Sequence, residues 1–135
     1  MKRTLNILVL LVLATGFFNA TSAEIGKFDT KVAIITFNTE VIDYGTVLQN
    51  SEGVKTFIFT NEGDAPLLIT TVKTSCGCTV PNYSKTPILP GDSGEIQIKY
   101  NTHKLGAFTK TITVVSNAEG GNKILKIKGT IVAAK

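Results

Sequence analysis

Hydrophobic and polar residues alternate with a period of two along much of the chain after residue 30. The segment Glu95–Asn101 shows the pattern clearly, with Ile96, Ile98 and Tyr100 on one parity and Glu95, Gln97 and Lys99 on the other. Such alternation is typical of a β-strand with one buried and one solvated face. Further strands are predicted where strand-forming residues lie between clusters of Gly, Pro, Asn and Asp: Lys31–Phe37, Val41–Val47, Val54–Asn61, Leu67–Ser75, Thr86–Leu89, Phe108–Ser116 and Lys123–Val132.

Seven or eight short strands with regular turn signals predict an all-β fold, an antiparallel two-sheet β-sandwich of immunoglobulin-like architecture. A small closed barrel is the alternative, because strand number alone does not decide closure. Leu89-Pro90-Gly91-Asp92 has Pro90 and Gly91 in the middle positions of a type II turn. The predicted core consists of Phe37, Phe57, Phe59, Ile96, Ile98, Phe108, Ile112, Val114 and Ile127.

The first 23 residues have the layout of a secretory signal peptide. Two positive charges, Lys2 and Arg3, precede an apolar run from Leu5 to Ala14 and a small-residue region that ends at Ala23. An uncleaved membrane anchor is the alternative, but the apolar run is shorter than the roughly 20 residues needed to cross a bilayer. We therefore expect residues 1–23 to be a signal peptide and residues 24–135 to form a single domain.

Loss of the leader changes the charge of the chain. Removal of Lys2 and Arg3 lowers the formal net charge from +4 to +2, and Arg3 is the single arginine of the sequence. Without arginine, bidentate contacts to phosphates and base edges are missing, so nucleic acid is not an expected partner. Contact with a membrane is expected only through an uncleaved leader.

Both cysteines lie in the stretch Thr74–Pro81, T-S-C-G-C-T-V-P. In an exported protein Cys76 and Cys78 tend to pair. Residues i and i+2 of a regular strand are about 6.6–6.8 Å apart, at the limit for an unstrained bridge, and Gly77 lets the chain bend to a shorter span. A disulfide here stabilises little, about 1.6 kcal/mol from loop closure. Val80-Pro81 is expected to direct the chain out of the sheet after this turn, so Pro81 is a predicted turn residue.

Other chemistry for the cysteines has weaker support. A redox centre would be favoured by an exposed bridge, but no helix start follows to lower the pKa of a thiol. A metal site needs more than two thiolates, and His103 is the single histidine, so Cys76, Cys78 and His103 are the candidate ligands. A cysteine nucleophile of the sortase kind is also disfavoured. In this chain the histidine follows the cysteines, a second cysteine lies beside the first, and no arginine remains to stabilise an oxyanion.

Five segments together resemble a known family. They are N-E-G-D-A-P-L, S-C-G-C-T-V-P, P-I-L-P-G-D-S-G-E-I, G-A-F-T-K-T-I-T-V-V-S-N-A and L-K-I-K-G-T-I, within residues 37–132. Their order is similar to that of the secreted bacterial family catalogued as domain of unknown function 1573. The resemblance implies an immunoglobulin-like domain outside the cytoplasm, and it implies no activity.

We therefore expect an exported, non-catalytic protein of the bacterial periplasm or cell surface, a binding or structural module that docks another envelope protein or a glycan. We expect no enzymatic activity and no cofactor. The alternative hypothesis is a thiol-redox or copper-handling envelope protein that uses Cys76-Gly77-Cys78.

Overall fold

The computed structural model describes Gly26 and residues 29–135. The predicted signal peptide, residues 1–23, and its cleavage point lie outside the described residues. Within this described part of the chain, no helix is long and apolar enough to cross a membrane.

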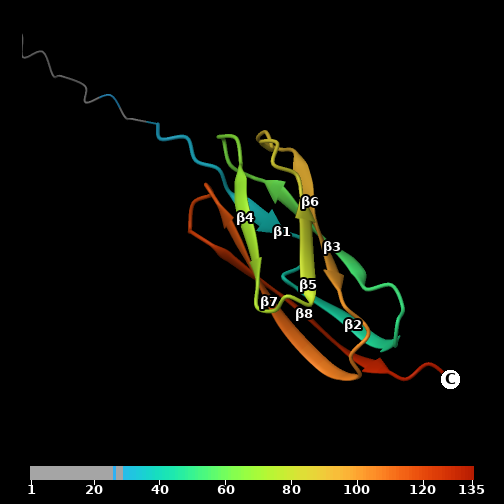
Figure 1. Ribbon diagram of the computed structural model, residues 1–135. Helices are drawn as coiled ribbons and strands as arrows, with labels where there is room; N and C mark the ends of the chain where they lie inside the picture. Colours follow the sequence, from blue (N-terminus) through green and yellow to red (C-terminus); the bar gives the residue numbers. More distant parts are fainter. Residues whose placement is uncertain (1–25, 27–28) are drawn as a thin grey trace, which may run out of the picture.

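In the described part of the chain, eight strands form two sheets that face each other (Figure 1). In chain order they are β1 (Ile35–Phe37), β2 (Val41–Leu48), β3 (Val54–Asn61), β4 (Ile69–Thr74), β5 (Thr79–Tyr83), β6 (Ser93–Tyr100), β7 (Gly106–Ser116) and β8 (Lys123–Val132). Sheet A has the order β1-β3-β6-β5, and sheet B has the order β2-β8-β7-β4. The all-β sandwich predicted from the sequence is confirmed.

One strand pair departs from the predicted antiparallel arrangement. β2 and β8 run parallel, with Val41 opposite Lys126 and Leu48 opposite Val132, whereas every other pair of strands is antiparallel. No hairpin joins β2 to β8, so local turn chemistry does not set their relative direction. A bulge interrupts this pair between Asp43 and Thr46, where Gly45 has a φ of 66°.

Side chains from both sheets form one hydrophobic core. All nine core residues predicted from the alternation are buried. The predicted core did not include Tyr44 or Tyr100, although the alternation had placed Tyr100 on the same face as Ile96 and Ile98. Both tyrosines pack with Phe108 in an aromatic cluster near one end of the sandwich. The core therefore extends to the end where the loops after β2 and β6 lie.

Asn61, at the end of β3, is fully buried and holds the following turn together. Its Nδ2 donates to the carbonyl oxygens of Ala65 (2.8 Å) and Ile88 (2.9 Å). Its Oδ1 accepts the backbone N–H groups of Gly63 (3.0 Å) and Ile34 (3.3 Å). The contact with Ile34 lies just before β1, which is shorter than the strand predicted for residues 31–37.

The segment after the cysteines differs most from the prediction. Thr79–Tyr83 is an edge strand, β5, in which Pro81 lies opposite Ile98 of β6. The prediction that Pro81 forms a turn and directs the chain out of the sheet is wrong, because an edge strand tolerates a residue without an N–H. The strand predicted at Thr86–Leu89 is reduced to one isolated bridge between Ile88 and Leu67.

Candidate functional site

A groove of about 450 Å³ lies at the end of the sandwich that carries the two cysteines. Three separate segments line it: residues 50–54 before and at the start of β3, residues 77–80 after β4, and residues 99–103 at the end of β6. We call this the cysteine-end groove. Of the 77–80 segment, the lining residues are Gly77, Cys78 and Val80.

Strand pairing brings these segments together. Lys99 of β6 lies between Val54 of β3 and Val80 of β5 in the register of sheet A, so one row of the sheet supplies all three to the groove. Val80 is 58% exposed, which leaves an apolar side chain at the position that pairs with Lys99. The groove therefore offers apolar and charged contacts side by side.

The cysteines lie in a tight turn between sheet B and sheet A. The Thr79 N–H donates to the Cys76 carbonyl (3.2 Å), which closes a four-residue turn. The Thr74 hydroxyl donates to the same carbonyl (2.9 Å), and the Asn101 N–H donates to the Cys78 carbonyl (2.8 Å). Gly77 does not have a positive φ, and a Cβ there would meet open space. The turn is thus held by backbone hydrogen bonds and by the Thr74 hydroxyl.

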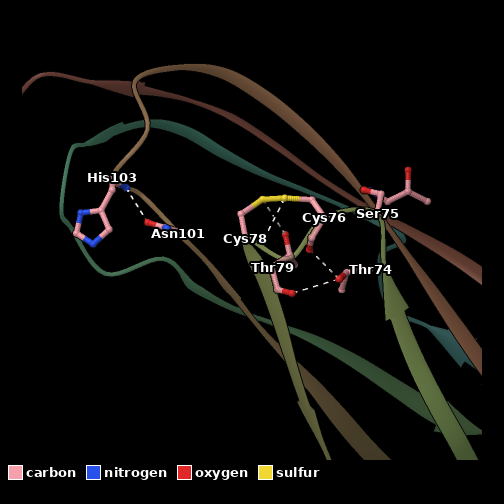
Figure 2. Close-up of a disulfide and its surroundings, with 8 residues drawn as sticks. Thr74, Ser75, Cys76, Cys78, Thr79, Asn101 and His103 are labelled. Carbon is pink, nitrogen blue, oxygen red and sulfur yellow. Dashed lines mark hydrogen bonds between the residues drawn. A yellow bond between two sulfur atoms is a disulfide. The ribbon is translucent and has the colours of Figure 1, made fainter.

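Cys76 and Cys78 are joined by a disulfide in the structure, with their Cα atoms 5.3 Å apart (Figure 2). The backbone N–H of Cys78 donates to the Cys76 Sγ (3.1 Å). Both residues are half-buried, and Cys78 also packs against the hydrophobic core. That the protein is exported, and that the pair is bonded in the exported protein, stay predictions.

His103, the third candidate ligand, lines the same groove as Cys78. Figure 2 shows it on the Cys78 side of the disulfide, beside Asn101. Its Nδ1 contacts the Asn50 Oδ1, and its backbone N–H donates to the Asn101 Oδ1 (3.0 Å). Among residues 29–135 and Gly26, no group of three or more His, Cys, Asp or Glu side chains could hold a metal ion.

The wall of the groove before β3 rests on the aromatic cluster. The buried Tyr44 hydroxyl donates to the Gly53 carbonyl (2.7 Å), and burial raises the pKa of Tyr44 to about 12. Burial also raises the pKa of Tyr100. A Cβ on Gly53 would overlap the Tyr100 carbonyl oxygen, so this position needs glycine. The sequence analysis did not assign residues 50–54 to a site. The signal available there was Gly53 in the short loop Ser51-Glu52-Gly53 before the strand.

The hydroxyl groups of the groove make structural contacts. The Ser51 Oγ donates to the Leu48 carbonyl (2.6 Å), and the Thr102 Oγ1 donates to the Ser51 carbonyl (2.6 Å). The Ser51 and Thr102 hydroxyls are thus both engaged by backbone carbonyls at the end of β2 and in the loop between β2 and β3. The acidic and basic side chains of the lining are Glu52, Lys99 and His103.

The two sheets, their order and the turn that carries the disulfide define an immunoglobulin-like β-sandwich with a groove at its cysteine end. The chain belongs to the family described as "Protein of unknown function (DUF1573)", which matches residues 35–131. The family suspected from the sequence is confirmed. No curated protein matches the chain in sequence.

Solved structures with similar folds come from distant proteins. A protein of unknown function from Porphyromonas gingivalis W83 has a TM-score of 0.65 and 17% identity over 73% of this chain, which spans 46% of that protein. The ASH/PapD-like domain 7 of human CEP192 has a TM-score of 0.65 and 7% identity, and the match covers 77% of this chain and 89% of that domain. The secreted serine protease VesC from Vibrio cholerae has a TM-score of 0.58 and 16% identity over 76% of this chain and 24% of that protein. At such identities the likeness shows the fold alone.

Proposed function

We propose that this protein is an exported, non-catalytic binding module of the bacterial envelope whose cysteine-end groove holds a segment of another envelope protein. The groove itself carries this proposal. Its volume of about 450 Å³ falls in the range of ligand sites, and three segments distant in sequence build it. The leader-like residues 1–23 and the paired cysteines support export to an oxidising compartment.

The lining favours a polypeptide over a glycan. The exposed Val80 offers an apolar contact, and Glu52 and Lys99 offer one charge of each sign. The aromatic ring that borders the groove, Tyr100, is 6% exposed, so it has no free face on which a sugar could stack. A peptide segment with an apolar side chain and nearby charged groups fits these contacts.

Site-specific photo-crosslinking in living cells tests the proposal. A photoreactive amino acid replaces Val80 in the groove or, as the matched control, Ile124 on β8, since the two side chains are 58% and 53% exposed. We expect the Val80 probe to give a discrete adduct with one polypeptide and the Ile124 probe to give none.

Adducts of equal yield at both sites, or none at Val80, would contradict the groove as the binding surface. An adduct at Val80 that contains glycan and no second polypeptide would contradict the class of partner. Lys99→Glu in the Val80-probe protein reverses a charge in the lining and should lower the yield of the polypeptide adduct.

A thiol-redox role is the second candidate function, because one observation favours it. Cys78 lines the groove, so the disulfide is within reach of a bound partner. The corresponding test is the redox state of the cysteines in cells. A pair that cycles between thiol and disulfide during growth supports the redox role, and a pair that stays fully oxidised contradicts it.

A further inference from the structure

The two sulfur atoms of the disulfide have different surroundings. Cys78 lines the cysteine-end groove, whereas Cys76 does not. Figure 2 shows the S–S bond running from Cys76, on the side of Thr74 and Ser75, to Cys78, on the side of Asn101 and His103. A group seated in the groove therefore approaches the bond at its Cys78 end.

The backbone also distinguishes the two sulfurs. The N–H of Cys78 donates to the Cys76 Sγ (3.1 Å). A hydrogen bond from a backbone N–H to a thiolate stabilises the charged form, so Cys76 is the better leaving group of the pair. The position of Cys78 in the groove lining thus favours attack at Cys78, and the hydrogen bond to the Cys76 Sγ favours departure of Cys76.

From these observations we propose that the groove is a site of thiol–disulfide exchange for a cysteine-bearing polypeptide, with Cys78 as the sulfur that is attacked. The partner's thiolate forms a new S–S bond with the Cys78 Sγ. The Cys76–Cys78 bond breaks, and its electron pair leaves with the Cys76 Sγ as a thiolate, which takes a proton from water. The partner sulfur is oxidised to the disulfide level, Cys76 is reduced, and no further oxidant is needed.

The lining of the groove suits this step. Lys99 and His103 lie in the same groove as Cys78, so an approaching thiolate meets an ammonium group and an imidazole, and Glu52 is the carboxylate in that lining. The two-residue spacing makes opening of the bridge inexpensive, because loop closure contributes only about 1.6 kcal/mol to folding. The mixed disulfide therefore forms without unfolding the sandwich, as a covalent latch on the bound segment.

This inference rests on the groove being the binding surface, and mapping of early adducts tests it. The purified, oxidised protein is mixed with glutathione or with a short cysteine-containing peptide. The reaction is stopped with acid after increasing times, and the protein is cut with pepsin at acidic pH, where exchange is slow. Tandem mass spectrometry then assigns each adduct to Cys76 or Cys78, and the same reaction in concentrated urea is the control.

We expect native protein to give Cys78 adducts in excess of Cys76 adducts by about tenfold or more when extrapolated to zero time. In urea, where the groove and the hydrogen bond are lost, the ratio should be near one. A native ratio near one, a preference for Cys76, or no adduct under conditions that modify the unfolded chain would overturn the proposal. A peptide adduct that forms no faster than the glutathione adduct would overturn the polypeptide as the favoured thiol.

Crosslinking at Val80 with both cysteines intact, analysed after full reduction, separates this inference from the proposed function. Photo-crosslinks survive reduction and mixed disulfides do not, so the remaining adduct reports binding without exchange. If the adduct persists while the mapping fails, the groove binds its partner and the exchange step is wrong. If both fail, the proposed function is wrong as well.

Discussion

Replacing Asn61 by alanine should remove a large part of the stability of the domain. This fully buried side chain makes four hydrogen bonds to backbone groups. The Ile88 carbonyl keeps a second bond, from the Leu67 N–H (2.8 Å). The N–H groups of Ile34 and Gly63 and the carbonyl of Ala65 lose Asn61 as their partner.

The size of the effect follows from these three groups. An unsatisfied buried backbone group costs about 1–3 kcal/mol. Ile34 is exposed, and Gly63 and Ala65 are half-buried, so water reaches them in part and the lower value applies. We therefore expect Asn61→Ala to lower the free energy of unfolding by about 3 kcal/mol, a substantial share of the 5–15 kcal/mol typical of a domain.

Urea unfolding followed by far-ultraviolet circular dichroism measures this change. The midpoint should fall by about 1–3 M with an unchanged slope. Asn38→Ala, at an exposed position, is the matched control and should change stability by less than about 0.5 kcal/mol. A loss below about 1 kcal/mol for Asn61→Ala would refute the role assigned to the amide.

Asn61→Asp is a sharper test. One carboxylate oxygen still accepts the N–H groups that bond to Oδ1, but the other replaces the Nδ2 donor and faces two carbonyl oxygens. Burial should hold the pKa of the new carboxyl above its ordinary value in the folded state. Its penalty is therefore small below pH of about 3.9 and grows as pH rises through the folded-state pKa. Equal destabilisation at acidic and neutral pH would contradict this reasoning.

Three further predictions concern the groove and its supports. Gly53→Ala should cost about 2–3 kcal/mol or more, since its Cβ overlaps the Tyr100 carbonyl, while Gly77→Ala should be nearly neutral; thermal unfolding of both variants compares them. Tyr44→Phe should cost about 1 kcal/mol for the lost hydrogen bond to Gly53, measured by urea unfolding. Because burial raises the pKa of Tyr44 from 10.0 to about 12, its contribution is complete below pH 10 and is lost as pH rises toward 12. The alkaline titration of tyrosine absorbance should therefore lose a late step in Tyr44→Phe. Cys76→Ser with Cys78→Ser should cost no more than about 1.6 kcal/mol, and a much larger loss in urea unfolding would show that the bridge is a structural clamp.

Much of the fold could be predicted because one face of each central strand is buried. In β6, for example, Ile96, Ile98 and Tyr100 alternate with polar residues, and β3 and β8 begin and end where the pattern places them. β5 was not predicted because a proline argues against a strand. In the structure Pro81 pairs with Ile98 on one side only, since β5 is the edge strand of its sheet. Tertiary context overrides the local signal there.

The candidate site was predictable only in part. The spacing of Cys76 and Cys78 is visible in the sequence, and so is the isolation of His103. Their juxtaposition in one groove depends on the register that places Thr79 opposite Tyr100 and brings Cys78 to Asn101. Register between distant strands is set by packing of the whole sandwich, so a single sequence does not reveal it.

The intact mass of the protein isolated from its native cells tests most directly the claim that the domain is exported with Cys76 and Cys78 bonded. We expect the mass of residues 24–135 less two hydrogen atoms, and a gain of about 2 Da after reduction under denaturing conditions. A chain that retains residues 1–23, or a mass that reduction leaves unchanged, would contradict that claim.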